Sequence, residues 1–255
     1  MSSKVSILMN CFNGEDYLQS SLQSIFSQTY QNCEIIFVDN FSDDRSIAIA
    51  SSFDDKRLLI KSTPRRMNLG EARNFGTQYF SGKYLAFLDV DDLWMPGKLS
   101  KQVELMDRLN LVLTYGGART IDANNNTLND FTPSKDNISF RRLLYRYDIN
   151  QQTVMINIEQ EPVTFIESKK YAPDNPLFMS IIGKHQRRCH FINEHLVDYR
   201  IHTNNLSKSL LNIRYQEGLD TLYYLKSRFP EHARNYQLEF FLAIAKKTLQ
   251  IYATK

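Results

Sequence analysis

Three aspartates, Asp89, Asp91 and Asp92, fall within four residues, directly after the apolar run 84–88. Carboxylates this close together repel one another unless a positive charge neutralises them. Mg²⁺ and Mn²⁺ prefer oxygen ligands, and such a cation also bridges a diphosphate and neutralises a leaving nucleotide. The cluster therefore predicts a divalent-cation site. The alternative is an acid-rich helix start before Pro96, which the position of Asp89 immediately after the apolar run disfavours.

Residues 68–76, Asn-Leu-Gly-Glu-Ala-Arg-Asn-Phe-Gly, form a second polar run. Gly70 allows close backbone approach at a helix start. Arg73 is suited to meet a phosphate or to pair with an aspartate, and Asn74 is suited to fix a loop by hydrogen bonds. A Gly-Xaa-Xaa-Arg turn on its own is also typical of simple helix capping, so both interpretations stay open.

The elements that must position these residues alternate along the first 115 residues between short apolar runs and amphipathic segments. This alternation is typical of a mainly parallel sheet covered by helices. Ligands bind at the carboxyl ends of strands in such sheets, so residues 10–15, Asp39 and the aspartate cluster should meet in one cleft. The predicted strands cover residues 5–9, 34–38, 57–61, 84–88 and 111–115, and the predicted helices lie after residue 17, after an N-cap at Ser42, over 70–80 and from Pro96.

The rest of the chain is less regular. We predict a loop over 122–137, a helix over 139–147, strands over 153–158, 188–192 and 196–201, and two C-terminal helices broken near Pro230. The chain thus divides into an α/β half (1–115), a second half of the same domain (116–208) and C-terminal helices (209–255). No P-loop, dinucleotide-binding Gly motif or Gly-Xaa-Ser-Xaa-Gly elbow is present.

Bulk composition fits a globular domain of 255 residues with 42% hydrophobic content, and a net charge of +3 is too small to indicate nucleic-acid binding. Three cysteines, no signal-peptide pattern and no apolar run near the ~20 residues of a membrane span indicate a cytoplasmic protein. Residues 201–255 carry eight Lys/Arg and four Asp/Glu. Such a tail suits peripheral contact with the inner face of an anionic membrane, and equally a solvated helix face.

Four signatures in order, residues 5–18, 27–44, 68–76 and 87–102, resemble those of the family 2 glycosyltransferases of bacterial surface-polysaccharide type. The resemblance implies the GT-A fold: a Rossmann-like, mainly parallel sheet flanked by helices, here with a C-terminal helical extension. It implies that Asp39 holds the nucleotide base, that Asp91 binds the metal, and that Asp89 contacts ribose or metal-bound phosphate. The implied nucleotide-sugar site comprises Cys11, Phe12, Asn13, Glu15, Asp39, Asn68, Gly70, Arg73, Asn74, Asp89 and Val90.

The resemblance also implies inverting transfer, in which a general base deprotonates an acceptor hydroxyl. The family has a Glu-Asp pair where this chain has Pro173 and Asp174. Asp174 is therefore the predicted base; the alternative is that it only caps a helix at Pro176. His202, in a Tyr-Arg-Xaa-His run, is a candidate third metal ligand or phosphate contact, or else a structural histidine.

The function implied by the resemblance is metal-dependent transfer of a sugar from a nucleotide-sugar donor, with UDP- or dTDP-sugars favoured and Mn²⁺ or Mg²⁺ as cofactor. The acceptor would be a hydroxyl of a glycan or a lipid-linked saccharide. The departure at Pro173 motivates an alternative, a non-catalytic subunit that binds nucleotide or glycan. A nucleotidyltransferase would need a basic, Gly-rich loop after the first strand, and residues 10–16 contain no Lys or Arg.

Overall fold

The computed structural model describes residues 2–130, 139–145, 147, 149–167, 172–203, 211–228 and 230–253. Residues 131–137 of the loop predicted over 122–137 and residue 146 of the helix predicted over 139–147 lie outside these ranges.

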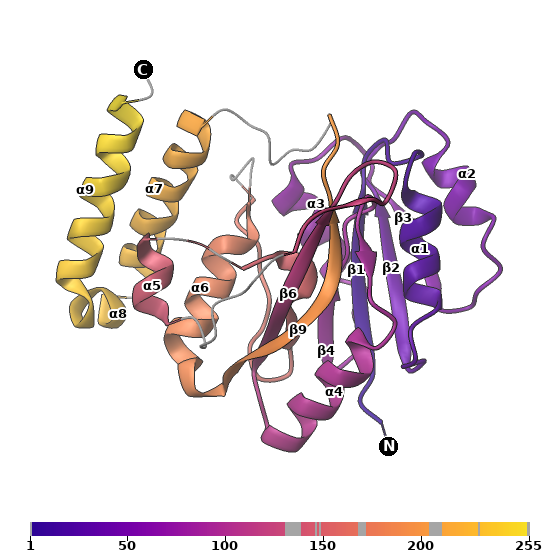
Figure 1. Cartoon of the computed structure of the whole chain (residues 1–255), viewed down its shortest axis with the longest axis horizontal. Coiled ribbons are helices and arrows are strands. Elements are labelled where there is room, and N and C mark those ends of the chain that lie inside the picture. Colours follow the sequence, from indigo (N-terminus) through magenta and orange to yellow (C-terminus); the bar gives the residue numbers. More distant parts are fainter. Residues whose placement is uncertain are drawn as a thin grey trace.

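One mixed sheet organises the chain (Figure 1). Its strand order is β3-β2-β1-β4-β8-β6-β9-β5, and β7 pairs with β6. Its first four strands are mutually parallel, as predicted. Beyond them, β8 is antiparallel to both neighbours, β6 and β9 are parallel to each other, and β5 is antiparallel to β9. The strands are β1 (Val5–Cys11), β2 (Cys33–Asp39), β3 (Leu58–Ser62), β4 (Tyr84–Phe87), β5 (Leu93–Trp94), β6 (Leu113–Ile121), β7 (Thr127–Asn129), β8 (Met155–Asn157) and β9 (Cys189–Arg200).

Side chains of the central strands alternate between two hydrophobic cores, because successive residues of a strand point to opposite faces. Ile35 and Phe37 of β2 enter one core, which is covered by α1 (Leu18–Phe26), α2 (Ser46–Ser51) and α4 (Lys98–Leu109). Ile36 and Val38 enter the other. That second core is covered by α3 (Leu69–Thr77), α5 (Phe140–Tyr145), α6 (Asp174–His185) and the C-terminal helices.

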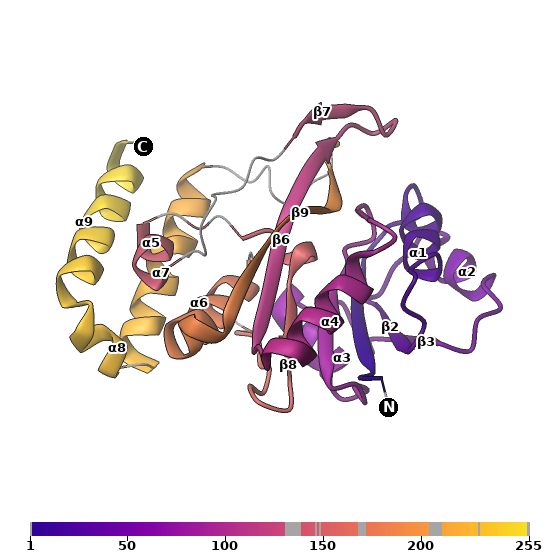
Figure 2. The same cartoon turned by 60° about the horizontal axis from the view of Figure 1, so that its bottom comes forward.

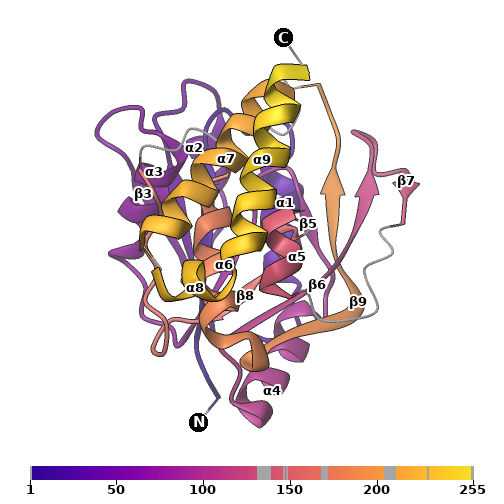
Figure 3. The ribbon, with the colours of Figure 1, turned by 90° about the vertical axis from the view of Figure 1, so that its left-hand side faces the viewer.

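The C-terminal helices are α7 (Leu211–Arg228), α8 (Pro230–Asn235) and α9 (Gln237–Ala253), and they stand beside α5 and α6 (Figure 3). Phe240 and Ala243 of α9 are buried with Leu222 and Leu225 of α7 in the second core. The outer face of α9 leaves large apolar side chains exposed. These are Leu238, Phe241, Leu242 and Leu249. No helix in the described part of the chain combines the length and apolar character that a membrane crossing requires.

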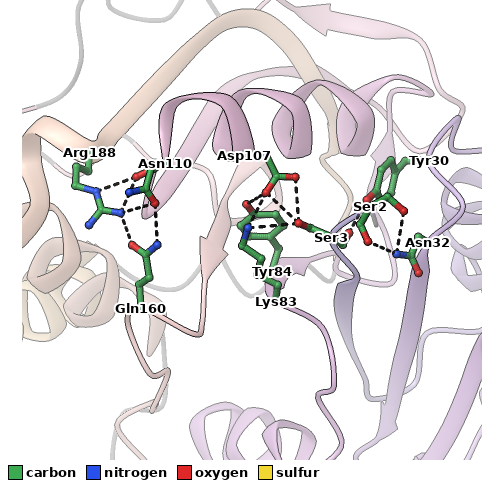
Figure 4. A network of polar contacts seen from close by, with 10 residues as sticks. All are labelled: Ser2, Ser3, Tyr30, Asn32, Lys83, Tyr84, Asp107, Asn110, Gln160 and Arg188. Atoms are coloured by element: carbon green, nitrogen blue, oxygen red, sulfur yellow. Dashed lines mark hydrogen bonds and ion pairs between the residues drawn. The ribbon is translucent and has the colours of Figure 1, made fainter.

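The amino-terminal edge of the sheet is closed by a polar network around Asp107, at the end of α4 (Figure 4). Its carboxylate accepts hydrogen bonds from Lys83 Nζ at 2.7 Å, Tyr84 Oη at 2.6 Å and Ser3 Oγ at 2.9 Å. Burial alone would raise the pKa of Asp107, but these donors hold it below its ordinary value. Next to it, the Arg188 guanidinium donates to the carbonyl oxygen of Asn110 at 2.6 Å.

Three local predictions were wrong. Helix α2 begins at Ser46 rather than after a cap at Ser42. The two strands predicted over 188–192 and 196–201 are one strand, β9, whose register against β6 shifts around Gly117. The predicted loop after residue 122 contains β7, which folds back on β6 as a hairpin (Figure 2).

Candidate active site

The loop after β1 is fixed to the loop after β2 by hydrogen bonds between neighbouring strand ends. The backbone N–H of Asn13 donates to Ser42 Oγ at 3.0 Å, and the N–H of Gly14 donates to Ser46 Oγ at 2.9 Å. The N–H of Glu15 donates to Asp44 Oδ2 at 2.9 Å. Ser42, predicted as a helix cap, therefore orders the first loop instead.

Asp39 ends β2 and lies at the floor of this pair of loops. It is buried, and Oδ2 accepts a hydrogen bond from the N–H of Ser42 at 3.3 Å. Among the described residues, Oδ1 has no partner although it is shielded from solvent. A buried carboxylate oxygen without a donor is costly, so this atom is suited to accept a hydrogen bond from a ligand.

Two predicted pocket residues flank Asp39. Cys11 is buried, and loss of hydration raises the pKa of its thiol to about 11, so it stays protonated at neutral pH. The ring of Phe12 is 37% exposed, and the Arg66 guanidinium lies 3.7 Å from its centroid. Phe12 thus offers an aromatic face at the rim, which a base or a cation can cover.

The three aspartates after β4 bring one carboxylate oxygen each within 4.8 Å of one another. The backbone N–H of Asp89 donates to Gln152 Oε1 at 3.2 Å, and its carboxylate accepts from Gln152 Nε2. Loss of hydration raises the pKa of Asp89 to about 6, although part of the residue is solvent-accessible. Arg73 opposes this increase in the pKa, and the negative charge of Asp91 adds to it.

Asp92 is fully buried, and its carboxylate is only half satisfied. Oδ1 accepts from the N–H of Arg200 at 2.8 Å, whereas Oδ2 has no partner among the described residues. Burial, reinforced by the charges of Asp91 and Asp89, raises the pKa of Asp92 well above its ordinary value. A hard divalent cation fits this donor set, because it would compensate the clustered negative charge through oxygen ligands.

Asp91 contacts the predicted third ligand. Its Oδ2 lies 2.9 Å from His202 Nε2, and its carbonyl oxygen accepts from Arg200 Nε at 2.8 Å. The His202 ring packs 5.0 Å from the ring of Tyr17. The structure thus brings Asp91 and His202 together from positions 111 residues apart.

Arg73 and Asp174 form a buried ion pair, and the charges of both residues act on Asp89. Arg73 Nη1 donates to Asp174 Oδ1 at 3.0 Å, and Nη2 donates to Gln151 Oε1 at 2.6 Å. Asp174 is the first residue of α6, and its side chain makes this pair rather than a capping hydrogen bond. Tyr147 lies nearby; burial and then the charge of Asp174 raise the pKa of its phenol, and its hydroxyl has no partner among the described residues.

The polar run 68–76 holds the segment that leads to Asp174. The Asn74 side chain accepts from the N–H of Phe165 and donates to its carbonyl oxygen, both at 2.9 Å. A Cβ on Gly70 would lie 2.4 Å from the carbonyl oxygen of Ile166, so the close approach at this glycine is to protein backbone. Asn68 donates to the carbonyl oxygen of Glu167 at 3.4 Å. Contact of Asn68, Gly70 and Asn74 with a donor remains a prediction.

Sequence reasoning missed Gln151 and Gln152, in the 3₁₀ turn η1 (Gln151–Thr153), and the role of Arg200. Arg200 lies in the Tyr-Arg-Xaa-His run, which was a usable signal. Nothing in the local sequence marks the two glutamines, because their partners, Arg73 and Asp89, lie 78 and 63 residues away.

A sheet of this topology with an aspartate cluster after β4 defines the class: the fold is GT-A. Residues 6–162, more than half of the chain, match the family model of Glycosyl transferase family 2. The chain belongs to this family.

Relatives and solved structures extend the likeness. The chain is 32% identical over 153 residues to the Escherichia coli UDP-Glc:alpha-D-GlcNAc-diphosphoundecaprenol beta-1,3-glucosyltransferase WfgD. The aligned residues make up 60% of each protein, so the chain spans about three fifths of the length of that relative. S. aureus TarS 1–349 in complex with UDP-GlcNAc superposes with a TM-score of 0.77 at 16% identity, over 98% of this chain and 73% of that one. The Pyrobaculum calidifontis mannosyltransferase PcManGT, in complex with GDP-Man and Mn²⁺, superposes with a TM-score of 0.66 at 12% identity, over 99% of this chain and 75% of that one. These two structures establish the fold.

Proposed function

We propose that this chain is an inverting, metal-dependent glycosyltransferase that moves a sugar from a UDP- or dTDP-sugar to a hydroxyl of a glycan or lipid-linked acceptor. The observation that carries the proposal is the meeting of Asp39, the Asp89–Asp92 cluster and the Arg73–Asp174 pair at the carboxyl ends of β1, β2 and β4. The names of these relatives support the proposed acceptor, donor and metal. WfgD is named for a diphosphoundecaprenol acceptor, the TarS structure contains UDP-GlcNAc, and the PcManGT structure contains GDP-Man and Mn²⁺.

The donor half of the proposal places the nucleotide on Asp39. Its unpartnered Oδ1 would accept a hydrogen bond from an N–H of the base. The exposed ring of Phe12 would stack on that base, with Arg66 moving aside. The remaining pocket residues of this proposal are Cys11, Asn13, Glu15 and Val90.

Asp91, Asp89 and His202 would hold the divalent cation. The cation supplies charge neutralisation for a leaving nucleoside diphosphate when it is bound. Asp92 is the buried third carboxylate of the cluster. One of its oxygens accepts a hydrogen bond from the N–H of Arg200, and the other has no donor within the described residues.

Asp174 is the proposed base. Arg73 contacts only Oδ1, and Oδ2 receives no hydrogen bond within the described part of the chain. Oδ2 can therefore accept the proton of an acceptor hydroxyl as that oxygen attacks the anomeric carbon in line.

A donor panel tests the function. Purified protein is incubated with UDP-, dTDP-, GDP- and CMP-sugars, with Mn²⁺ or EDTA, and nucleotide release is measured together with thermal stability. We expect Mn²⁺-dependent release and stabilisation with one nucleotide class. Nucleotide binding without release, with and without saccharide acceptors, would instead support the non-catalytic binding subunit that Pro173 motivates.

We further propose that the C-terminal helices attach the protein peripherally to the inner face of the membrane, where a lipid-linked acceptor resides. The exposed side chains of Leu238, Phe241 and Leu249 on α9, beside the exposed Lys246, support this proposal. Co-sedimentation with vesicles that contain anionic phospholipid should decrease in the double variant Phe241→Asp/Leu249→Asp. Equal sedimentation of variant and wild type would refute this attachment.

A further inference from the structure

The 3₁₀ turn η1 carries two adjacent glutamines whose side chains reach the two halves of the site. Resting on the function proposed above, we propose that Gln151 and Gln152 are positioning residues: Gln152 sets the metal-site carboxylate of Asp89, and Gln151 sets the Arg73–Asp174 pair. Because the two glutamines are adjacent in this short turn, they fix the distance between Asp89 and the Arg73–Asp174 pair.

Gln152 contacts Asp89 through both atoms of its amide group. Oε1 accepts from the Asp89 N–H at 3.2 Å, and Nε2 donates to the Asp89 carboxylate. Gln152 is 3% exposed, so water does not compete for these contacts. An amide offers one acceptor and one donor on the same side chain. A carboxylate at position 152 would repel Asp89, and an aliphatic side chain would leave both groups of Asp89 unpaired.

Gln151 acts on the other half. Its Oε1 accepts from Arg73 Nη2 at 2.6 Å, while Nη1 of the same guanidinium donates to Asp174. Because a guanidinium is planar, partners on both terminal nitrogens fix its plane as well as its position. A neutral partner achieves this without competing with Asp174 for the positive charge.

The turn itself is anchored to buried groups outside the site. Asn150 Oδ1 accepts from the N–H of Gln152 at 2.9 Å. Trp94 Nε1 donates to the carbonyl oxygen of Gln152 at 3.1 Å, and Gln102 Nε2 donates to that of Thr153 at 2.9 Å. Trp94 belongs to the core that α4 covers, and Gln102 is buried on α4 itself. The glutamine side chains therefore extend from a rigid base, as positioning residues must.

A purely structural turn would make the same anchoring contacts, so the test must separate positioning from folding. Gln152→Met removes both contacts to Asp89 with little change in volume. Gln151→Glu keeps the acceptor for Arg73 but adds a second negative charge beside it. Gln160→Met is the matched control, because Gln160 contacts Arg188 and Asn110 at the opposite edge of the sheet (Figure 4).

The first readout needs no turnover: Mn²⁺-dependent binding of UDP by isothermal titration calorimetry. Groups that orient metal ligands typically change metal affinity by ~10–100-fold. We expect Gln152→Met to raise the Mn²⁺ concentration for half-maximal UDP binding by about tenfold, and Gln151→Glu and Gln160→Met to leave it within twofold. Unchanged Mn²⁺ dependence in a folded Gln152→Met protein would overturn the role of Gln152.

The second readout is the pH profile of kcat. In Gln151→Glu, the added carboxylate should raise the pH of the acidic limb by about one unit, because a like charge disfavours ionisation of Asp174. The limb should not move in Gln152→Met or Gln160→Met. A limb at the wild-type pH in all three variants would overturn the role of Gln151. Failure of the proposed function itself is distinguishable: wild type would then show no turnover, while the calorimetric test of Gln152 still applies.

Discussion

The two edges of the sheet hold carboxylates in opposite conditions. At the amino-terminal edge, Asp107 accepts hydrogen bonds from Lys83, Tyr84 and Ser3, and its pKa is held below the ordinary value. At the carboxyl-terminal edge, Asp92 has one backbone donor and one buried oxygen without a partner among the described residues, and its pKa is raised. Both edges belong to the same strands, so the difference lies in what surrounds each carboxylate.

The fold therefore places stabilising and ligand-binding carboxylates at opposite ends of the same strands. A satisfied carboxylate contributes to the folded state and has little left to offer a ligand. A crowded, poorly satisfied cluster opposes folding of the metal-free protein, and clusters of this kind mark functional sites.

Activity should separate the two edges most strongly. Asp174→Asn removes the proposed base while keeping the shape of the contact to Arg73, so turnover should fall by ~10²–10⁴-fold with nucleotide binding retained. Asp107→Asn should change turnover less than twofold. Initial rates and UDP titrations of both variants make the comparison. Loss of UDP binding in Asp174→Asn would indicate a structural role for this residue.

Metal binding should stabilise only through the carboxyl-terminal edge. At 100 times its Kd, a ligand specific for the folded state raises the free energy of unfolding by about 2.7 kcal/mol. We expect Mn²⁺ with UDP to produce such an increase in wild type and in Asp107→Asn, and not in Asp91→Asn. Denaturant titrations with and without Mn²⁺ measure it. An equal increase in Asp91→Asn would place the cation elsewhere.

The sequence predicts the strands that build this edge, because each of them reads as a short, largely apolar run. β1, β2, β3 and β4 lie within a few residues of the predicted ranges. It also predicts the cluster, because three aspartates in four residues are a local feature. The partners are not local. Gln152, Gln151 and Arg200 reach the site only through tertiary packing. No local pattern marks the two glutamines, whereas the Tyr-Arg-Xaa-His run marks Arg200.

Errors in the fold have similar causes. Ser42 has the residue type of a helix cap, but its hydroxyl is used by the N–H of Asn13 in a neighbouring loop. β9 was divided because its polar centre around Glu194 interrupts the apolar pattern, where the register against β6 shifts. All three residues of the short strand β7 are exposed, so no apolar alternation marks it.

Without metal, Asp92→Asn and Asp107→Asn should change the free energy of unfolding in opposite directions. Asp92→Asn keeps an acceptor for the N–H of Arg200 and replaces the unpartnered oxygen with an N–H₂ donor facing Asp89 and Asp91. It should therefore stabilise the protein in EDTA, by on the order of 1 kcal/mol. Asp107→Asn loses charged hydrogen bonds to Lys83 and Tyr84, so it should destabilise by a similar amount. Urea titrations give both values, and destabilisation by Asp92→Asn would contradict the contrast.

The smallest expected effect is the pH dependence of stability, and it also has opposite signs at the two edges. The pKa of Asp89 rises from an ordinary 3.8 to about 6, so the folded protein binds more protons than the unfolded chain between these values. The contribution of Asp89 to the free energy of unfolding is thus fully present below pH 3.8 and is lost as the pH rises through about 6. The pKa of Asp107 is lowered, so its contribution is present above 3.8 and is lost as the pH falls through the lowered value.

Urea titrations in EDTA from pH 3 to 7, for wild type, Asp89→Asn and Asp107→Asn, separate these contributions. The free energy of unfolding of wild type, relative to that of Asp89→Asn, should decrease as the pH rises from 4 to 6.5. Relative to that of Asp107→Asn, it should increase above pH 3 and then stay constant. Mn²⁺ with UDP should reverse the first trend, because ionised Asp89 then gains a positive partner. A first trend that Mn²⁺ leaves unchanged would mean that the raised pKa of Asp89 reflects burial alone, and the carboxyl-terminal edge would then differ from the Asp107 network without being a cation site.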